Sequence, residues 1–244
     1  MKYIVSFVFL FFVLMNAPVH AGIFDGDTYA GFGLSTFLLN GDNPANKEIF
    51  PKENEGVIGG GFPNWQSGIS LKGMLSIDQQ RVYRIPFSFD YYVMRGVQRL
   101  PDKYYTIRST HIIQIPTLSA GFEYAFANLP LANAKVYAGA DVRCSFVLPT
   151  ELEVALDYSN PTFPDTTRYY GKDAATRLGM ALRIGIDGEI AAPWYVNISI
   201  GYNSFNLIGR DALRGELFTP SKLSETQESI IGSIIANVMV QCKL

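Results

Sequence analysis

Apolar and polar residues alternate along most of the chain after residue 22, so that every second side chain falls on the same face. A period of two residues is typical of β-strands with one apolar and one polar face. The alternating segments are residues 28–39, 65–77, 81–94, 113–126, 134–148, 176–186, 194–205 and 230–243. The pattern therefore predicts eight strands of about 11 to 15 residues each, against about five or six in an ordinary strand.

The gaps between these segments alternate between long and short. They cover residues 40–64, 78–80, 96–111, 127–133, 149–173, 187–193 and 207–229. Barrels of the bacterial outer membrane have this rhythm, because short periplasmic turns alternate with long extracellular loops. We therefore expect an all-β fold, an eight-stranded antiparallel up-and-down transmembrane β-barrel with four long extracellular loops.

The polar faces of the predicted strands carry charged side chains separated by small residues. These charged residues are Lys72, Arg84, Asp90, Glu123, Lys135, Asp141, Arg143, Arg177 and Arg183. Aromatic residues such as Tyr83, Tyr124 and Trp194 lie at the ends of the apolar stripes, as in the interfacial girdle of a membrane barrel. The charges are therefore expected to face a polar lumen. Because eight strands enclose an interior only wide enough for side chains, we expect that lumen to be plugged rather than open to ions or solutes. A soluble, ligand-binding periplasmic barrel, with its apolar face inside, is the alternative.

The first 21 residues have the features of a secretory signal peptide. Lys2 precedes a nearly unbroken apolar run over residues 4–15, and Val19-His20-Ala21 gives a small-x-small cleavage site. The run is shorter than the roughly 20 residues that a membrane-spanning helix needs. We expect residues 1–21 to be a cleaved signal peptide and residues 22–244 to form the barrel in the outer membrane.

Composition narrows the functional classes further. Charged residues make up 17% of the chain and hydrophobic residues 48%, with a net charge of −2. A soluble domain has about 25% charged residues. The low charge excludes a disordered chain and gives no basic face for nucleic acid. With two His and two Cys there is little from which to build a metal site, and no cofactor is expected.

Several short motifs carry a resemblance to a known family. They are Ile115-Pro116, Phe122-Glu123-Tyr124, Val136-Tyr137-Ala138-Gly139-Ala140 and Ser199-Ile200-Gly201-Tyr202-Asn203. Over residues 27–244 the chain resembles the bacterial outer membrane β-barrel domain proteins, which are PorT-like and, in architecture, OmpX- and OmpA-like. The resemblance implies contact with outer-membrane lipid and insertion by the barrel-assembly machinery. Such barrels commonly end in an aromatic residue, whereas this chain ends Gln241-Cys242-Lys243-Leu244.

No residue is expected to be catalytic, to bind a cofactor or to bind a metal. An alternative is a rim-located lipid-modifying enzyme, similar to a lipid A deacylase, centred on His111 with the hydroxyl of Ser109 nearby. Cys144 and Cys242 are expected at opposite ends of the barrel, facing lipid and too far apart for a disulfide. The run Gly59-Gly60-Gly61 lacks the helix of a phosphate-binding loop. We therefore expect the protein to have a structural or surface-interaction role and not to be an enzyme. The surface for partners would be loops 40–64, 149–173 and 207–229.

Overall fold

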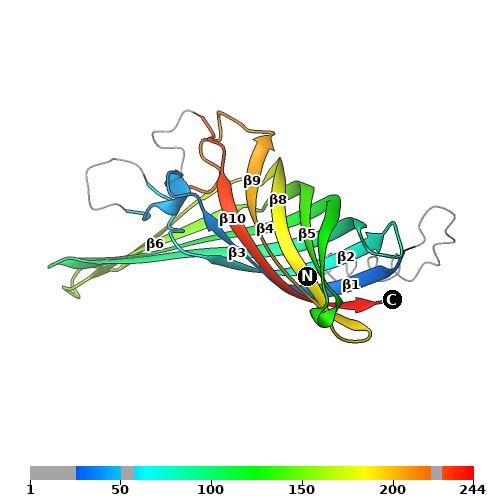
Figure 1. Ribbon diagram of the computed structural model, residues 1–244. Coiled ribbons are helices and arrows are strands. Elements are labelled where there is room, and N and C mark those ends of the chain that lie inside the picture. The colour runs from blue at the N-terminus through cyan, green and yellow to red at the C-terminus, as the bar shows by residue number, and fades with distance from the viewer. Residues whose placement is uncertain (1–25, 51–57, 221–226) are drawn as a thin grey trace.

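The computed structural model describes residues 26–50, 58–220 and 227–244, so the expected signal peptide lies outside the described residues. Eight strands pair in antiparallel fashion into a closed ring (Figure 1). They are β1 (Thr28–Leu39), β2 (Gln66–Ser76), β3 (Tyr83–Pro101), β4 (Tyr105–Leu129), β5 (Ala134–Val147), β8 (Ala175–Ala191), β9 (Trp194–Ile208) and β10 (Gly232–Lys243). The first and last strands close the ring, because β1 pairs with both β2 and β10. The prediction of an eight-stranded antiparallel barrel is confirmed.

The outer parts of β3 and β4 continue past the ring and carry a further hairpin. This hairpin consists of β6 (Thr150–Tyr158) and β7 (Thr166–Lys172), and β6 pairs with residues 105–112 of β4. The resulting sheet of residues 95–112, 150–158 and 166–172, which we call the blade, has the strand order β3-β4-β6-β7 and forms the long arm in Figure 1.

The blade corrects two of the predicted loops. Residues 96–111 are not a loop, since β3 runs to Pro101 and β4 begins at Tyr105, and residues 149–173 contain β6 and β7. The change in the outward side chains explains why the pattern of the ring does not continue here. Beyond Val93 the outward side chains of β3 are Arg95, Val97 and Arg99, so charged residues enter the outward face while the backbone remains paired.

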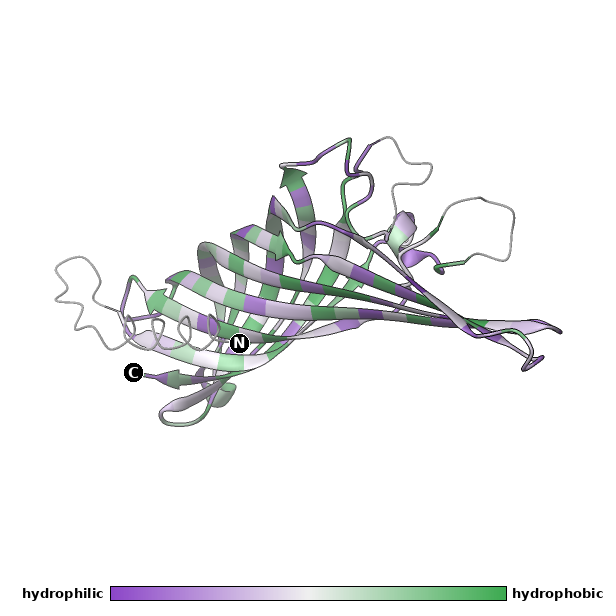
Figure 2. Ribbon diagram, turned by 180° about the vertical axis from the view of Figure 1, so that it is seen from behind, coloured by the Kyte–Doolittle hydropathy of each residue, from purple (hydrophilic) through white to green (hydrophobic). Residues whose placement is uncertain are grey.

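Outside the blade, the outward face of the ring is apolar and exposed. Phe32 and Leu34 on β1 are each 63% exposed, and Val142 on β5 is 64% exposed. Figure 2 shows the resulting alternation of hydrophobic and hydrophilic positions along the strands. Tyr83 and Tyr124 stack on this exterior near the short turns, with ring centroids 5.5 Å apart. A continuous apolar exterior on a closed ring fits hydrocarbon, whereas a soluble barrel has a polar exterior.

Helices contribute little to the fold. The described residues contain the short 3₁₀ segments η1 (Pro44–Asn46) and η2 (Leu131–Asn133). Within residues 26–50, 58–220 and 227–244, no helix is long and apolar enough to cross a membrane.

The inside of the barrel has two layers. Towards the short turns it is charged, and towards the long loops it is apolar. The apolar layer, which we call the plug, combines inward-facing strand residues with residues of two loops. These are the loop between β1 and β2, which we call the first loop, and the loop between β9 and β10, which we call the last loop. The members of the plug are Phe37, Leu39, Ala45, Phe62, Tyr92, Met94, Ile113, Ile115, Val147, Ala181, Phe205, Leu217, Phe218, Ile231 and Ile235. The sequence predicted a polar interior and did not reveal the plug.

Candidate functional site

Glu123 on β4 is the centre of the charged layer. Its side chain is fully buried, and Lys72 on β2 lies 2.7 Å from Oε1. Arg183 on β8 lies 3.0 Å from Oε1, and Arg84 on β3 lies 3.3 Å from Oε2. The carboxylate thus gathers cations from three other strands. A buried charge is tolerated only when it is paired in this way.

The remaining charges of the layer extend this network across the lumen. Arg183 also contacts Asp141 at 2.9 Å, and Arg143 contacts Asp90 at 2.6 Å. Arg84 also lies 3.0 Å from Asp187, which the sequence analysis assigned to a turn. The free space in the middle of the lumen is about 10 Å³, roughly the volume that one water molecule needs.

Arg81 closes the charged layer at the turn end of the barrel. Its guanidinium lies 4.9 Å from the ring centroid of Tyr195 and 5.7 Å from that of Tyr29, and it approaches Asp187 at 3.6 Å. The residue has a φ of 55°, a left-handed conformation that is uncommon for a side chain of this size. Sequence reasoning missed Arg81 because it begins the predicted strand 81–94 in phase with the apolar face that contains Tyr83, whereas β3 begins only at Tyr83.

Two of the predicted lumen charges lie elsewhere. Lys135 is at the turn end, partly exposed, with its ammonium donating to Asn128 Oδ1 at 2.7 Å. Arg177 lies at the loop end, where it binds Glu228 of the last loop. The other predicted positions lie inside the ring and are ion-paired there.

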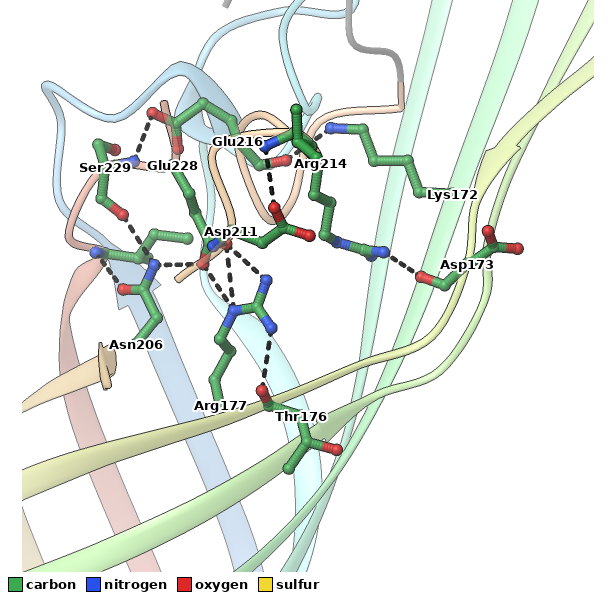
Figure 3. A network of polar contacts seen from close by, with 12 residues as sticks. Lys172, Asp173, Thr176, Arg177, Asn206, Asp211, Arg214, Glu216, Glu228 and Ser229 are labelled. Carbon is green, nitrogen blue, oxygen red and sulfur yellow. Dashed lines mark hydrogen bonds and ion pairs between the residues drawn. The ribbon is translucent and has the colours of Figure 1, made fainter. Parts of the chain in front are cut away.

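Glu228 organises a polar network at the outer mouth, which we call the mouth network (Figure 3). Arg177 donates to both of its oxygens, from Nε at 2.9 Å to Oε1 and from Nη2 at 2.6 Å to Oε2. The Asn206 amide donates to Oε1 at 2.6 Å, and the backbone N–H of Asp211 donates to Oε2 at 3.1 Å. One buried carboxylate therefore ties the last loop to β8 and β9. Glu228 lies in a predicted loop, and no spacing in the sequence marked it.

A second carboxylate secures the same loop. The backbone N–H of Ser229 donates to Glu216 Oε1 at 3.0 Å, and the Lys172 ammonium donates to the Glu216 carbonyl at 2.6 Å. Arg214 donates to the Asp173 carbonyl between β7 and β8. These contacts hold Leu217 and Phe218 in the plug.

His111, the residue of the alternative enzymatic hypothesis, lies beneath the first loop. It is fully buried, its Nδ1 is 2.7 Å from the Gly60 carbonyl oxygen, and its ring lies 5.0 Å from that of Phe62. The neutral imidazole therefore donates from Nδ1 to the loop. Ser109 lies on the same face of β4 and donates to the Gln98 carbonyl at 3.5 Å.

The surroundings of His111 do not resemble a catalytic rim. In the described part of the chain, no carboxylate forms an ion pair or hydrogen bond with the ring. His111 lies beyond the lipid-facing belt, level with Gly96 and one position past the outward-facing Arg95. Burial lowers the pKa of His111 from 6.5 to about 4, so the ring is neutral at pH 7.

The cysteines lie far apart, and the glycine run packs closely against its surroundings. Cys144 pairs with Leu118 near the loop end and Cys242 pairs with Ala30 at the turn end, so the two lie at opposite ends of the barrel, as predicted. Both thiols are free. Gly60 packs against backbone atoms of Ala45 and Phe218, so a Cβ there would lie only 2.6 Å from two carbonyl oxygens. The glycines thus let the first loop pass closely over the plug.

The blade has two unlike faces and a free edge. On the mouth side Leu100, Ile107 and Leu156 are adjacent across β3, β4 and β6. The opposite face is charged, and Arg108 on it pairs with Asp157 at 2.6 Å. Among the described strands, β7 pairs with β6 alone, and residues 166–171 are exposed.

Comparison with known proteins concerns the fold alone. No protein-family model and no curated protein sequence matches the chain. Among solved structures, it is similar to Ail, the attachment invasion locus protein of Yersinia pestis, in complex with the heparin analogue sucrose octasulfate. That match has a TM-score of 0.41 and 10% identity, and it covers 90% of this chain and 99% of Ail.

A further Ail structure and Neisserial surface protein A are also similar. The Ail structure gives a TM-score of 0.41 at 9% identity over 91% of this chain and all of Ail. Neisserial surface protein A gives 0.36 at 11% identity over 89% of this chain and 97% of its own. Strand pairing and the apolar exterior of this chain define its class: it is an integral β-barrel of the outer-membrane type with eight strands.

Proposed function

We propose that the protein is a surface-interaction protein in which a plugged barrel anchors the blade outside the membrane. The observation that carries the proposal is the free edge of β7, which is exposed over residues 166–171 and held beyond the ring by paired strands. An unpaired strand edge offers backbone N–H and C=O groups to an added strand. The side chains of β7 include Arg168, Tyr169 and Tyr170, so an acidic and aromatic partner strand fits best.

The interior supports an anchor rather than a pore. The cavity between Lys72, Asp141 and Arg143 in the charged layer has a volume of about 10 Å³, and the plug lies on its loop side. Ions or solutes would have to displace paired charges and packed aromatic side chains to pass. Catalysis at His111 has no comparable support, since that ring is buried and bonded to the first loop.

Strand addition at β7 is tested with a peptide copying β6, the strand that β7 already pairs with on its other side. The probe is the peptide Thr150–Tyr158, with a scrambled peptide of the same composition as control. We expect the copy to bind the purified barrel and the scrambled peptide not to. In the variant Arg168→Pro/Tyr169→Pro, binding should be lost, because successive backbone N–H groups alternate in direction and one of the two residues donates at the free edge.

The matched control is Lys103→Pro, at the tip between β3 and β4, which leaves the β7 edge intact. Equal binding of the copied and scrambled peptides, or full binding by the double proline variant, would contradict the proposal. Heat-modifiable migration of each variant shows separately that the barrel itself has folded.

A further inference from the structure

A hollow lies on the outward face of the barrel where β2 begins and β3 leaves the ring. Its volume is about 530 Å³, and Trp65, Val93, Arg95 and Val97 are among its lining residues. Trp65 is half exposed and Val97 is 64% exposed, so the hollow opens outward and not into the lumen. It lies outside the mouth network and the plug.

The hollow sits at the upper boundary of the lipid-facing belt. Phe87 and Val93 on β3 face outward and belong to the apolar exterior, and the next outward residue is Arg95. Four residues further, Arg99 also faces outward and is exposed. At this depth a bilayer changes from hydrocarbon to headgroups, which is where tryptophan is enriched and where arginine reaches charged groups.

Two arginines on this face, Arg95 and Arg99, have no ion-pair partner among the described residues. Arg99 stands directly opposite Arg108 across the β3–β4 pair, an arrangement of like charges that is unfavourable. Asp157 neutralises Arg108 through a 2.6 Å contact. None of the described residues forms a side-chain ion pair with Arg95 or Arg99. An anion at this position would therefore give Arg95 and Arg99 the ionic partner that Asp157 gives to Arg108.

We propose that Trp65, Arg95 and Arg99, which we call the arginine rim, bind the phosphorylated headgroup of a lipid in the outer leaflet. A guanidinium is weakly hydrated and binds phosphate oxygens in a bidentate manner. At about 3.3 Å per residue, Arg95 and Arg99 are roughly 13 Å apart along β3, so they can engage separate phosphates. The acyl chains of the lipid then continue down the apolar exterior, while Trp65 packs at the level of the headgroup.

Native mass spectrometry of the full barrel in neutral detergent, titrated with lipid A, tests this inference. We expect one or more lipid A adducts on the wild type and about 30-fold weaker binding in Arg95→Gln/Arg99→Gln, from two surface charges. Arg108→Gln is the control, because it removes an arginine from the same face that Asp157 already neutralises. Its binding should match the wild type.

Two further probes test whether the arginine rim recognises the phosphate groups of an intact lipid. Dephosphorylated lipid A should bind as weakly to the wild type as lipid A does to the double variant. Inorganic phosphate at millimolar concentration should not displace lipid A. Unchanged binding by the double variant, equal binding of the dephosphorylated lipid, or displacement by free phosphate would each overturn the inference. The peptide assay of the β7 edge is independent of all three results.

Discussion

At the scale of single residues, Glu123 is the side chain on which the charged layer depends most. It contacts Lys72, Arg84 and Arg183, and all of these groups are buried. Removing one member of a buried ionic group costs more than the group contributed, because the remaining charges keep their burial without a partner.

Glu123→Gln should therefore lower the free energy of unfolding by about 3 to 5 kcal/mol, with the barrel still able to form. Urea unfolding of the reconstituted protein measures the change. Glu189→Gln is the matched control, since Glu189 is a partly exposed carboxylate at the turn end that accepts from Asn133. A loss below about 1 kcal/mol for Glu123→Gln, as for an exposed pair, would refute the central role of this residue.

His111 makes the docking of the first loop sensitive to acid. Its pKa is about 4 in the folded protein, because burial disfavours the charged ring, against 6.5 in the unfolded chain. Between these values the unfolded chain binds more protons, so stability falls as the pH drops from 6.5 towards 4. The largest effect is about 3 kcal/mol.

Urea unfolding at pH 7 and pH 4.5 checks this expectation, with His111→Asn as the comparison. The variant should be less stable at pH 7, and its stability should change less between the two pH values. An identical pH dependence in both proteins would show that His111 does not titrate as its burial predicts.

At the scale of elements, the ring followed from the sequence, whereas the plug and the blade did not. In β3, Tyr83 to Val93 alternate regularly because one side meets hydrocarbon and the other meets the charged layer. In β4, Ile112, Ile113 and Ile115 break the alternation, since Ile113 and Ile115 pack in the plug while their neighbours face out. Period-two reasoning identifies a strand only where its two faces meet different surroundings.

The loops illustrate the same limit. Glu228 and Glu216 are acidic residues in a predicted loop, and in the sequence they look like solvated positions. Their roles depend on Arg177 and Lys172, which are more than 40 residues away in the chain. Contacts of this kind leave no periodic signal, so the mouth network could be found only in three dimensions.

In the mouth network, the Glu228 carboxylate ties the last loop to β8 and β9. Glu228→Gln removes the charge that Arg177 and the Asp211 N–H contact, so residues 209–220 should become more open to protease. Limited proteolysis followed by mass spectrometry measures the rate of cleavage, which we expect to rise about tenfold for a loss near 1.4 kcal/mol. Glu153→Gln on the exposed face of β6 is the control. Equal rates for the two variants would contradict this role of Glu228.

At the scale of the whole molecule, the apolar and the charged faces of the sheet exchange sides between the ring and the blade. Within the membrane the outside is apolar and the inside is charged, as Val142 and Arg143 show on β5. Beyond the membrane the mouth-side face is apolar and the outward face is charged, as Leu100 and Arg99 show on β3. This inversion occurs where β3 passes from the ring into the blade.

A plugged barrel should not conduct ions. In planar bilayers the purified protein is expected to give no steady channel currents, because paired charges and the plug fill the lumen. Phe62→Ser/Phe218→Ser should also remain closed, since it loosens the plug but leaves the charged layer in place. Stable conductance steps from the wild type would refute the plugged lumen.

Cell fractionation with heat-modifiable gel migration shows whether the protein is an integral barrel of the outer membrane. We predict that the protein is recovered in the outer-membrane fraction only after detergent extraction, and that the unheated sample migrates differently from the boiled one. Recovery in the osmotic-shock fraction, with the same migration before and after boiling, would contradict the account.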